Sequence, residues 1–135
     1  MSKVHSNRTW RCAMAWREKQ TPHWSKVTCK ECLNDRSNHE LYLKCFYSTM
    51  VLNGCDILAL EKDQNKRDPS FQQFRDDNYS DEMIESLDWF YRISKETCKL
   101  GSIQDRLDHV RKLPKSEERY LVIACAASWF HDHCK

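Results

Sequence analysis

Apolar side chains recur at three- and four-residue spacing along most of the chain, which is the period of an amphipathic helix. The clearest stripe predicts a helix over Asp81–Leu100. Ser80 precedes it as a capping residue, acidic side chains fill its positive first turn, and Gly101 follows its end. The residues of this stripe are Met83, Leu87, Phe90, Tyr91, Ser94 and Cys98.

Four further helices follow from apolar spacing combined with capping and stop signals. Asn53-Gly54 is a natural stop, because glycine reaches the left-handed conformation at low cost. Pro114 ends another helix, and the run Tyr120 to Phe130 is apolar nearly all round, so we expect the last helix to be the buried centre of the body. The four predicted helices cover Glu40–Leu52, Asp56–Lys62, Ile103–Leu113 and Glu117 to about His131.

Residues 61–80 have the weakest helical pattern, with Pro69 at the centre, and we interpret them as a connecting loop. Its acidic pair, Asp76 and Asp77, could imitate a phosphate surface for a partner or bind a cation. The alternative is that Ser80 caps the following helix and the neighbouring carboxylates stabilise its positive end.

The first third of the chain has a different pattern. Thr9 to Trp16 alternate between lighter and heavier side chains, which predicts a strand, and Trp24 to Thr28 predicts a second one after a polar excursion. These two strands would form a short β-ribbon that ends at the pair Cys29-x2-Cys32.

A Cys-x2-Cys pair on a tight turn is typical of a structural zinc site, which needs four thiolate or imidazole ligands. Upstream, Cys12 and His5 complete a Cys3His set with Cys29 and Cys32. His23 is the alternative fourth ligand, and His39 is a less favoured one. The cofactor that we expect is therefore one structural Zn²⁺.

The same residues carry a resemblance. His5, then Arg8-Thr9-Trp10-Arg11-Cys12, then Val27-Thr28-Cys29-Lys30-Glu31-Cys32-Leu33 resemble small zinc-ribbon proteins of phages and other mobile elements. The likeness covers about the first quarter of the chain. It implies metal binding and a place in the cytoplasm of a host cell, and it implies no particular activity.

Composition supports one compact unit. The chain has 135 residues, 40% of them hydrophobic, with only two glycines, which disfavours a turn-rich all-β fold. We therefore predict an α+β fold, mostly α, with a short zinc-stapled β-ribbon packed on about five helices, divided as 1–36 and 37–135. Eight cysteines without an apolar leader indicate reduced thiols and a soluble intracellular protein. Tyr120–Phe130 is too short to span a membrane.

Charge and motifs narrow the function. The net charge of +2 is too small for nucleic-acid binding by the whole surface, although residues 1–36 carry eight Lys/Arg against three Asp/Glu. The common nucleotide, hydrolase and metalloprotease motifs are absent from the sequence. The ending His131-Asp132-His133-Cys134 could hold a second metal with His109 or Cys98, but no motif supports hydrolysis there.

The sequence thus favours a non-enzymatic interaction protein that binds a protein complex of the host. The resemblance to phage proteins extends this to an inhibitor of a host defence complex, comparable to an anti-CRISPR protein. The alternative is a nucleic-acid-binding or regulatory zinc-ribbon module that uses its basic N-terminal residues and tryptophans. The residues that we expect to contact a partner are Arg11, Trp16, Arg17, Trp24, Asp76 and Asp77.

Overall fold

The computed structural model describes residues 5–6, 20–21 and 27–133. Within them the chain is mostly helical. Two strands of two residues each, β1 (His5–Ser6) and β2 (Gln20–Thr21), pair in parallel, with His5 opposite Gln20. The six helices are α1 (Lys30–Leu52), α2 (Ile57–Arg67), α3 (Ser70–Asn78), α4 (Asp81–Thr97), α5 (Ile103–Arg111) and α6 (Glu117–His133).

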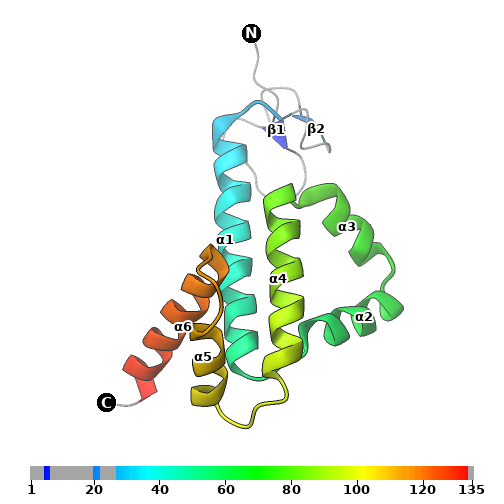
Figure 1. The fold of residues 1–135 in the computed structure, drawn as a ribbon. Helices are drawn as coiled ribbons and strands as arrows, with labels where there is room; N and C mark the ends of the chain where they lie inside the picture. The colour runs from blue at the N-terminus through cyan, green and yellow to red at the C-terminus, as the bar shows by residue number, and fades with distance from the viewer. Residues whose placement is uncertain (1–4, 7–19, 22–26, 134–135) are drawn as a thin grey trace.

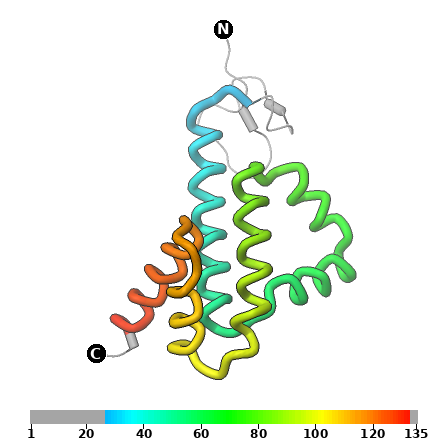
Figure 2. Tube along the Cα trace, in the orientation of Figure 1, coloured from blue at the N-terminus to red at the C-terminus, as the bar shows by residue number. Residues whose placement is uncertain are grey.

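The long helices α1 and α4 lie side by side and run in the same direction (Figure 1). Parallel neighbours need a return connection, and α2 and α3 supply it as an arm on the far side of α4 (Figure 1). On the other side, α5 turns back beside α1, and α6 crosses α1 and diverges from it towards the C-terminus (Figure 2). The extensive contacts of α1 with both α4 and α6 make α1 the central element of the fold.

The predicted α+β fold with a β-ribbon is wrong for the part of the chain that the structure describes. The first predicted strand, Thr9–Trp16, lies outside the described residues, and the described end of the second, Val27–Thr28, has no regular structure. The strand pair that is described is parallel, whereas the return of a ribbon requires antiparallel pairing. The proposed division into 1–36 and 37–135 stays a prediction, and α1 itself runs across residue 36.

Helix α1 begins ten residues earlier than its apolar pattern predicts. Cys29 is the N-cap residue with extended backbone, and its carbonyl accepts a hydrogen bond from the amide of Leu33 at 3.1 Å. Ser37 lies inside the helix, where its hydroxyl donates to the Leu33 carbonyl at 3.1 Å. The end of α1 is as predicted. Gly54, with φ +76°, donates to the carbonyl of Val51 at 3.1 Å.

The loop predicted over residues 61–80 is wrong, because α2 and α3 occupy most of it. Four polar side chains from four helices hold these two helices on the body, and we call them the buried quartet: Tyr47, Glu61, Arg75 and Tyr91. Glu61 and Arg75 are both 7% exposed and form an ion pair. Tyr47 donates to the Glu61 carboxylate at 2.7 Å, and Arg75 donates to the Tyr91 hydroxyl at 2.7 Å.

The apolar core lies between α1, α4, α5 and the inner face of α6. Helix α4 is as predicted at its start, since the Ser80 hydroxyl accepts from the Met83 amide at 3.2 Å. The expectation that α6 is the buried centre is wrong, because Tyr120 is 69% exposed and only one face of α6 packs on its neighbours. The buried members of the core are Tyr47, Val51, Leu52, Ile57, Met83, Leu87, Phe90, Ile93, Leu107, Val110, Val122 and Ala126.

Candidate partner-binding site beside α1

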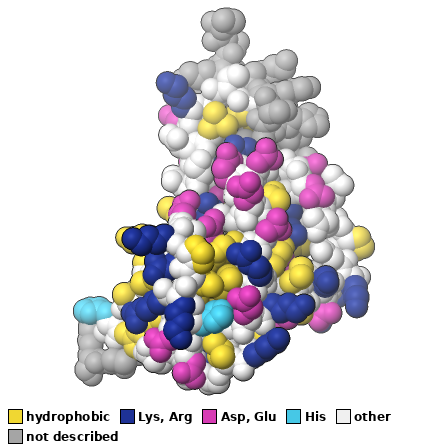
Figure 3. Space-filling model, viewed as in Figure 1, with side chains coloured by type: hydrophobic (Ala, Val, Ile, Leu, Met, Phe, Trp, Pro, Cys, Tyr) yellow, Lys and Arg dark blue, Asp and Glu magenta, His cyan; other side chains and the backbone are white. Residues whose placement is uncertain are grey.

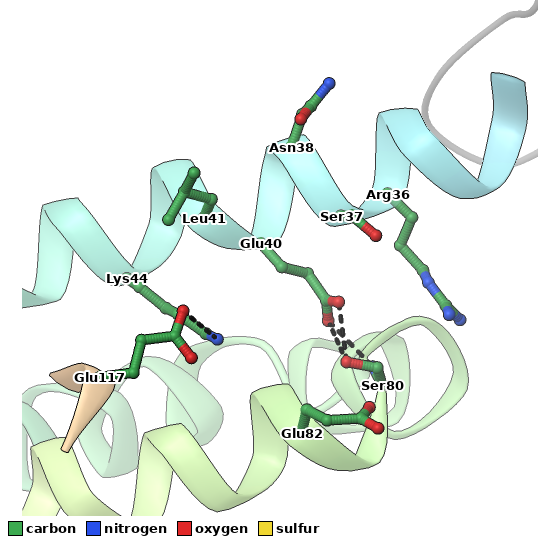
Figure 4. A pocket seen from close by; sticks show the side chains of 9 residues that line it. All are labelled: Arg36, Ser37, Asn38, Glu40, Leu41, Lys44, Ser80, Glu82 and Glu117. Carbon is green, nitrogen blue, oxygen red and sulfur yellow. Dashed lines mark hydrogen bonds and ion pairs between the residues drawn. The ribbon is translucent and has the colours of Figure 1, made fainter.

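A hollow of about 510 Å³ lies between α1, the start of α4 and the start of α6 (Figure 4). Its walls are mostly polar and carry charges of both signs. The hollow is possible because α4 begins half-way along α1, where Glu40 meets Ser80, and α6 begins close by. Its lining residues are Arg36, Ser37, Asn38, Glu40, Leu41, Lys44, Ser80, Glu82 and Glu117.

Glu40 connects α1 to the start of α4. Its side chain is directed at Ser80 (Figure 4), and one carboxylate oxygen accepts from the Ser80 amide at 2.9 Å while the other accepts from the Ser80 hydroxyl at 2.8 Å. The residue is only 8% exposed, and it lies at the positive end of α4, where a negative charge is favourable. Because the Ser80 hydroxyl also caps the Met83 amide, this pair is engaged in structure. Glu40 and Ser80 therefore anchor the start of α4 to α1.

Two cationic side chains of α1 border the hollow. Arg36 extends towards the start of α4 (Figure 4), and Lys44 lies 3.8 Å from the Glu117 carboxylate, with its side chain 12% exposed. The lining contains no histidine or cysteine, and its Ser80 is already held by Glu40 and by the Met83 amide. Such a wall of mixed charge can bind polar groups of a ligand or partner.

Beside the hollow, α1 exposes three large apolar side chains, which we call the α1 strip: Leu41, Tyr42 and Phe46. Their exposed fractions are 46%, 68% and 52%. Tyr42 and Phe46 are four residues apart and therefore share one face of the helix, while Leu41 belongs to the wall of the hollow. Aromatic side chains are enriched at protein interfaces and depleted from ordinary exposed surface. Leu41 therefore belongs to both the α1 strip and the wall of the hollow, whereas Tyr42 and Phe46 project from another side of α1.

Charge is unevenly distributed over the molecule. Asp and Glu side chains gather over the start of α4, and Lys and Arg side chains spread over the lower half of the same face (Figure 3). Asp81 and Glu82 are exposed in the acidic part. A partner at the hollow would therefore meet carboxylates on its α4 side.

The two described cysteines of the predicted zinc site lie together at the head of α1. Cys29 and Cys32 are 2% and 0% exposed and pack with Val27 and Leu33. They occupy the N-cap and first turn of α1, where the helix dipole favours negatively charged groups such as thiolates. Both thiols are therefore placed in a closed environment, as structural metal ligands are.

The structure does not describe the side chains of the other predicted zinc ligands. For His5 the structure describes the backbone in β1, and Cys12 and His23 lie outside the described residues. Among the residues that are described, no group of three or more metal-ligating side chains comes together. His39 lies in α1, where burial lowers its pKa and the nearby Glu40 partly opposes that effect. The zinc site stays a prediction.

Four of the predicted partner-binding residues, Arg11, Trp16, Arg17 and Trp24, lie outside the described part of the chain. Asp76 and Asp77 are exposed on α3, which lies across α4 from α1 (Figure 1). Their carboxylates accept from the side-chain amides of Gln72 and Gln73 at 3.0 and 2.9 Å. These hydrogen bonds span one helical turn, so the acidic pair supports α3 and is separate from the α1 strip.

The predicted second cluster is only partly described. His131 and Asp132 are exposed at the end of α6, and Cys134 lies outside the description. His109, which we considered as a partner for this cluster, lies instead 3.0 Å from the Glu96 carboxylate of α4. The structure thus gives His109 a different neighbour.

The apolar spacing that predicts a helix over residues 40–52 does not reveal the α1 strip, because it does not show which of the apolar side chains face outward. The buried positions of α1 include the polar residues Glu40 and Ser48 as well as Tyr47 and Val51. The buried face of the helix is therefore not the face that the apolar residues alone would indicate. A signal was present in the aromatic residues Tyr42 and Phe46, which lie four residues apart on the opposite face.

No protein-family model, curated protein or solved structure matches the chain. In the described part of the chain, no helix is both long and apolar enough to cross a bilayer.

Proposed function

We propose that this chain is a non-enzymatic interaction protein that binds a protein partner through the α1 strip and the adjoining hollow. The observation that carries the proposal is the exposure of Leu41, Tyr42 and Phe46 beside a hollow whose walls bear charges of both signs. Such a surface offers an apolar anchor with a polar border, which is the usual anatomy of a protein interface.

The energetics favour a partner for these side chains. Burying an exposed Phe or Leu side chain contributes about 1.5–3 kcal/mol. Tyr42 and Phe46 project from a long helix that packs on both α4 and α6, so little backbone freedom is lost when they are covered. Two or three such anchors on a rigid element are typical of interface hot spots.

Zinc belongs to the proposal as a structural cofactor. Cys29 and Cys32 would supply two thiolate ligands from the head of α1, and Cys12 with His5 would supply the other two, with His23 as the alternative to His5. The support is the burial of both described thiols at the start of the helix that carries the α1 strip. A metal there would tie the N-terminal segment to α1 and contribute folding free energy.

The more specific form of the proposal, an inhibitor that binds a host defence complex, is supported by the zinc-ribbon resemblance of the first quarter of the chain alone. The alternative, nucleic-acid binding, would use basic N-terminal residues. On the described site, Lys44 is paired with Glu117 and Glu82 borders the hollow, so the local charge disfavours phosphate.

The experiment compares capture of host proteins by three immobilised proteins: the wild type, the Tyr42→Ser/Phe46→Ser double variant, and Leu60→Ser. Leu60 is the matched control, because it is an apolar side chain 49% exposed on α2. We expect the double variant to lose at least about tenfold of a partner that the wild type and Leu60→Ser retain. Circular dichroism checks that all three are equally helical.

Two results would contradict the proposal. Equal capture by the double variant and the wild type would remove the α1 strip from the interface. Binding that nuclease abolishes, and that falls steeply between 50 and 200 mM salt, would favour the nucleic-acid alternative, because release of counterions makes such binding strongly salt-dependent.

A further inference from the structure

Two free cysteines from different helices meet where α6 crosses α1. The sulfur of Cys125 in α6 lies 3.8 Å from the backbone carbonyl oxygen of Cys45 in α1. Both residues are partly exposed, and neither forms a disulfide in this structure. These two thiols are thus neighbours in space although 80 positions separate them in the sequence.

Small side chains allow the close approach of the two helices. Ser48 of α1 and Ala126 of α6 are both fully buried, at 0% exposure. The Lys44–Glu117 ion pair joins the same two helices at the start of α6. A disulfide requires Cα atoms within about 7 Å, and a crossing of helices at small residues meets that requirement most readily.

The two thiols also influence one another. Burial raises the pKa of the Cys125 thiol, and the neighbouring Cys45 thiol raises it further. A raised pKa lowers the fraction of thiolate at neutral pH, so thiol–disulfide exchange at this pair should be faster at alkaline pH.

We propose that Cys45 and Cys125 are a redox-modification site, which forms an intramolecular disulfide by exchange with a low-molecular-weight disulfide such as oxidised glutathione. In this exchange one S–S bond forms in the protein while one S–S bond of the oxidant breaks. The two protein thiols are oxidised, and the oxidant leaves as two thiols that carry the protons. The product covalently joins α6 to α1.

The position gives the bond two consequences. It closes a loop of about 80 residues, so the oxidised protein is stabilised against unfolding. It also joins α6 to α1 at the residue that immediately precedes Phe46 of the α1 strip in the sequence. The other described cysteines differ from this pair: Cys29 and Cys32 are fully buried, and Cys55 and Cys98 are partly exposed elsewhere in the fold.

The test incubates the full-length protein, with zinc present, in excess oxidised glutathione and maps its cysteines by non-reducing peptide mass spectrometry. We expect a linked pair of peptides that contain Cys45 and Cys125, and a melting temperature about 10 °C above that of the reduced protein. Dithiothreitol should reverse both changes. The variants Cys45→Ala and Cys125→Ala should each lose them, and Cys55→Ala and Cys98→Ala should retain them.

Three outcomes would overturn the proposal. They are glutathione adducts on Cys45 and Cys125 without a link between them, a link to a different cysteine, and the Cys45–Cys125 link without any increase in melting temperature. Because the two control variants keep both cysteines of the pair, a general loss of folding in one substitution cannot produce the expected pattern.

Discussion

Replacing Arg75 by methionine tests whether the buried quartet holds α2 and α3 on the body of the protein. The guanidinium donates to the Glu61 carboxylate, to the Tyr91 hydroxyl at 2.7 Å and to the Gln72 side chain at 3.1 Å. It also lies over the Phe71 ring at 5.3 Å. Methionine retains most of the apolar stem, so the substitution removes mainly the charge and its hydrogen bonds.

The expected loss of stability follows from the Glu61 carboxylate, which the substitution leaves without its cation. Glu61 is 7% exposed and would keep its hydrogen bond from Tyr47, but its buried carboxylate would lose the compensating cation. Removal of one partner from a buried pair costs roughly 3–5 kcal/mol. We expect the lower end, about 3 kcal/mol, because two tyrosine hydroxyls still solvate the carboxylate. Urea unfolding followed by circular dichroism measures the free energy of unfolding.

Two further variants make the result interpretable. Arg67→Met removes an exposed arginine at the end of α2 and should change stability by less than about 0.5 kcal/mol. Adding Glu61→Gln to Arg75→Met removes the unpaired buried charge, so the double variant should be about 1–2 kcal/mol more stable than Arg75→Met alone. The reasoning is refuted if Arg75→Met unfolds like the wild type, or if Glu61→Gln gives no recovery.

Two more predictions concern backbone and pH. Gly54→Ala should lower the free energy of unfolding by about 1–2 kcal/mol, because φ is +76° there and a Cβ would lie 3.0 Å from the Arg106 guanidinium. Gly101→Ala, with open space around it, should lower it far less. Equal losses for the two variants in thermal unfolding would contradict this prediction. Burial and then Glu61 raise the pKa values of Tyr47 and Tyr91 above their usual range. In the native protein these two hydroxyls keep a proton that the unfolded chain releases, so the free energy of unfolding measured in urea should fall above about pH 10. The fall should be smaller in Tyr47→Phe. A free energy of unfolding that does not change with pH in this range would contradict the prediction.

Local signals made much of the helical body predictable. Ser80 caps α4 as its residue type indicates, and Gly54 ends α1 where glycine was expected. Ser102 likewise caps α5 by accepting from the Asp105 amide at 3.1 Å. In each case the residue acts on backbone within four positions, so the sequence pattern contains the whole interaction.

The parts that were not predictable depend on contacts between distant residues. Glu61 and Arg75 looked like the surface of a polar loop, because nothing local shows that Tyr47 and Tyr91 from other helices will complete their hydrogen bonds. Glu40 is similar, since its partner Ser80 lies forty positions away. A pattern of apolar and polar positions predicts that such polar residues are exposed, whereas contacts between distant helices bury them.

The candidate site was missed for the same reason. Glu40 turns inward although it is charged, and its neighbours Leu41 and Tyr42 face outward and belong to the α1 strip. The head of α1 was predicted better. The sequence paired Cys29 with Cys32, and the structure buries both at one helix start, although it begins a helix where a ribbon turn was expected.

Zinc content tests most directly whether Cys29 and Cys32 at the start of α1 bind a structural metal ion. Elemental analysis of purified wild type, Cys29→Ser, Cys32→Ser and Cys98→Ser, each with thermal unfolding before and after chelation, gives the answer. The account predicts one zinc per chain in the wild type and in Cys98→Ser, its loss in the other two variants, and a lower melting temperature once zinc is removed. Wild-type protein that folds without zinc, and melts unchanged in the presence of a chelator, would contradict it.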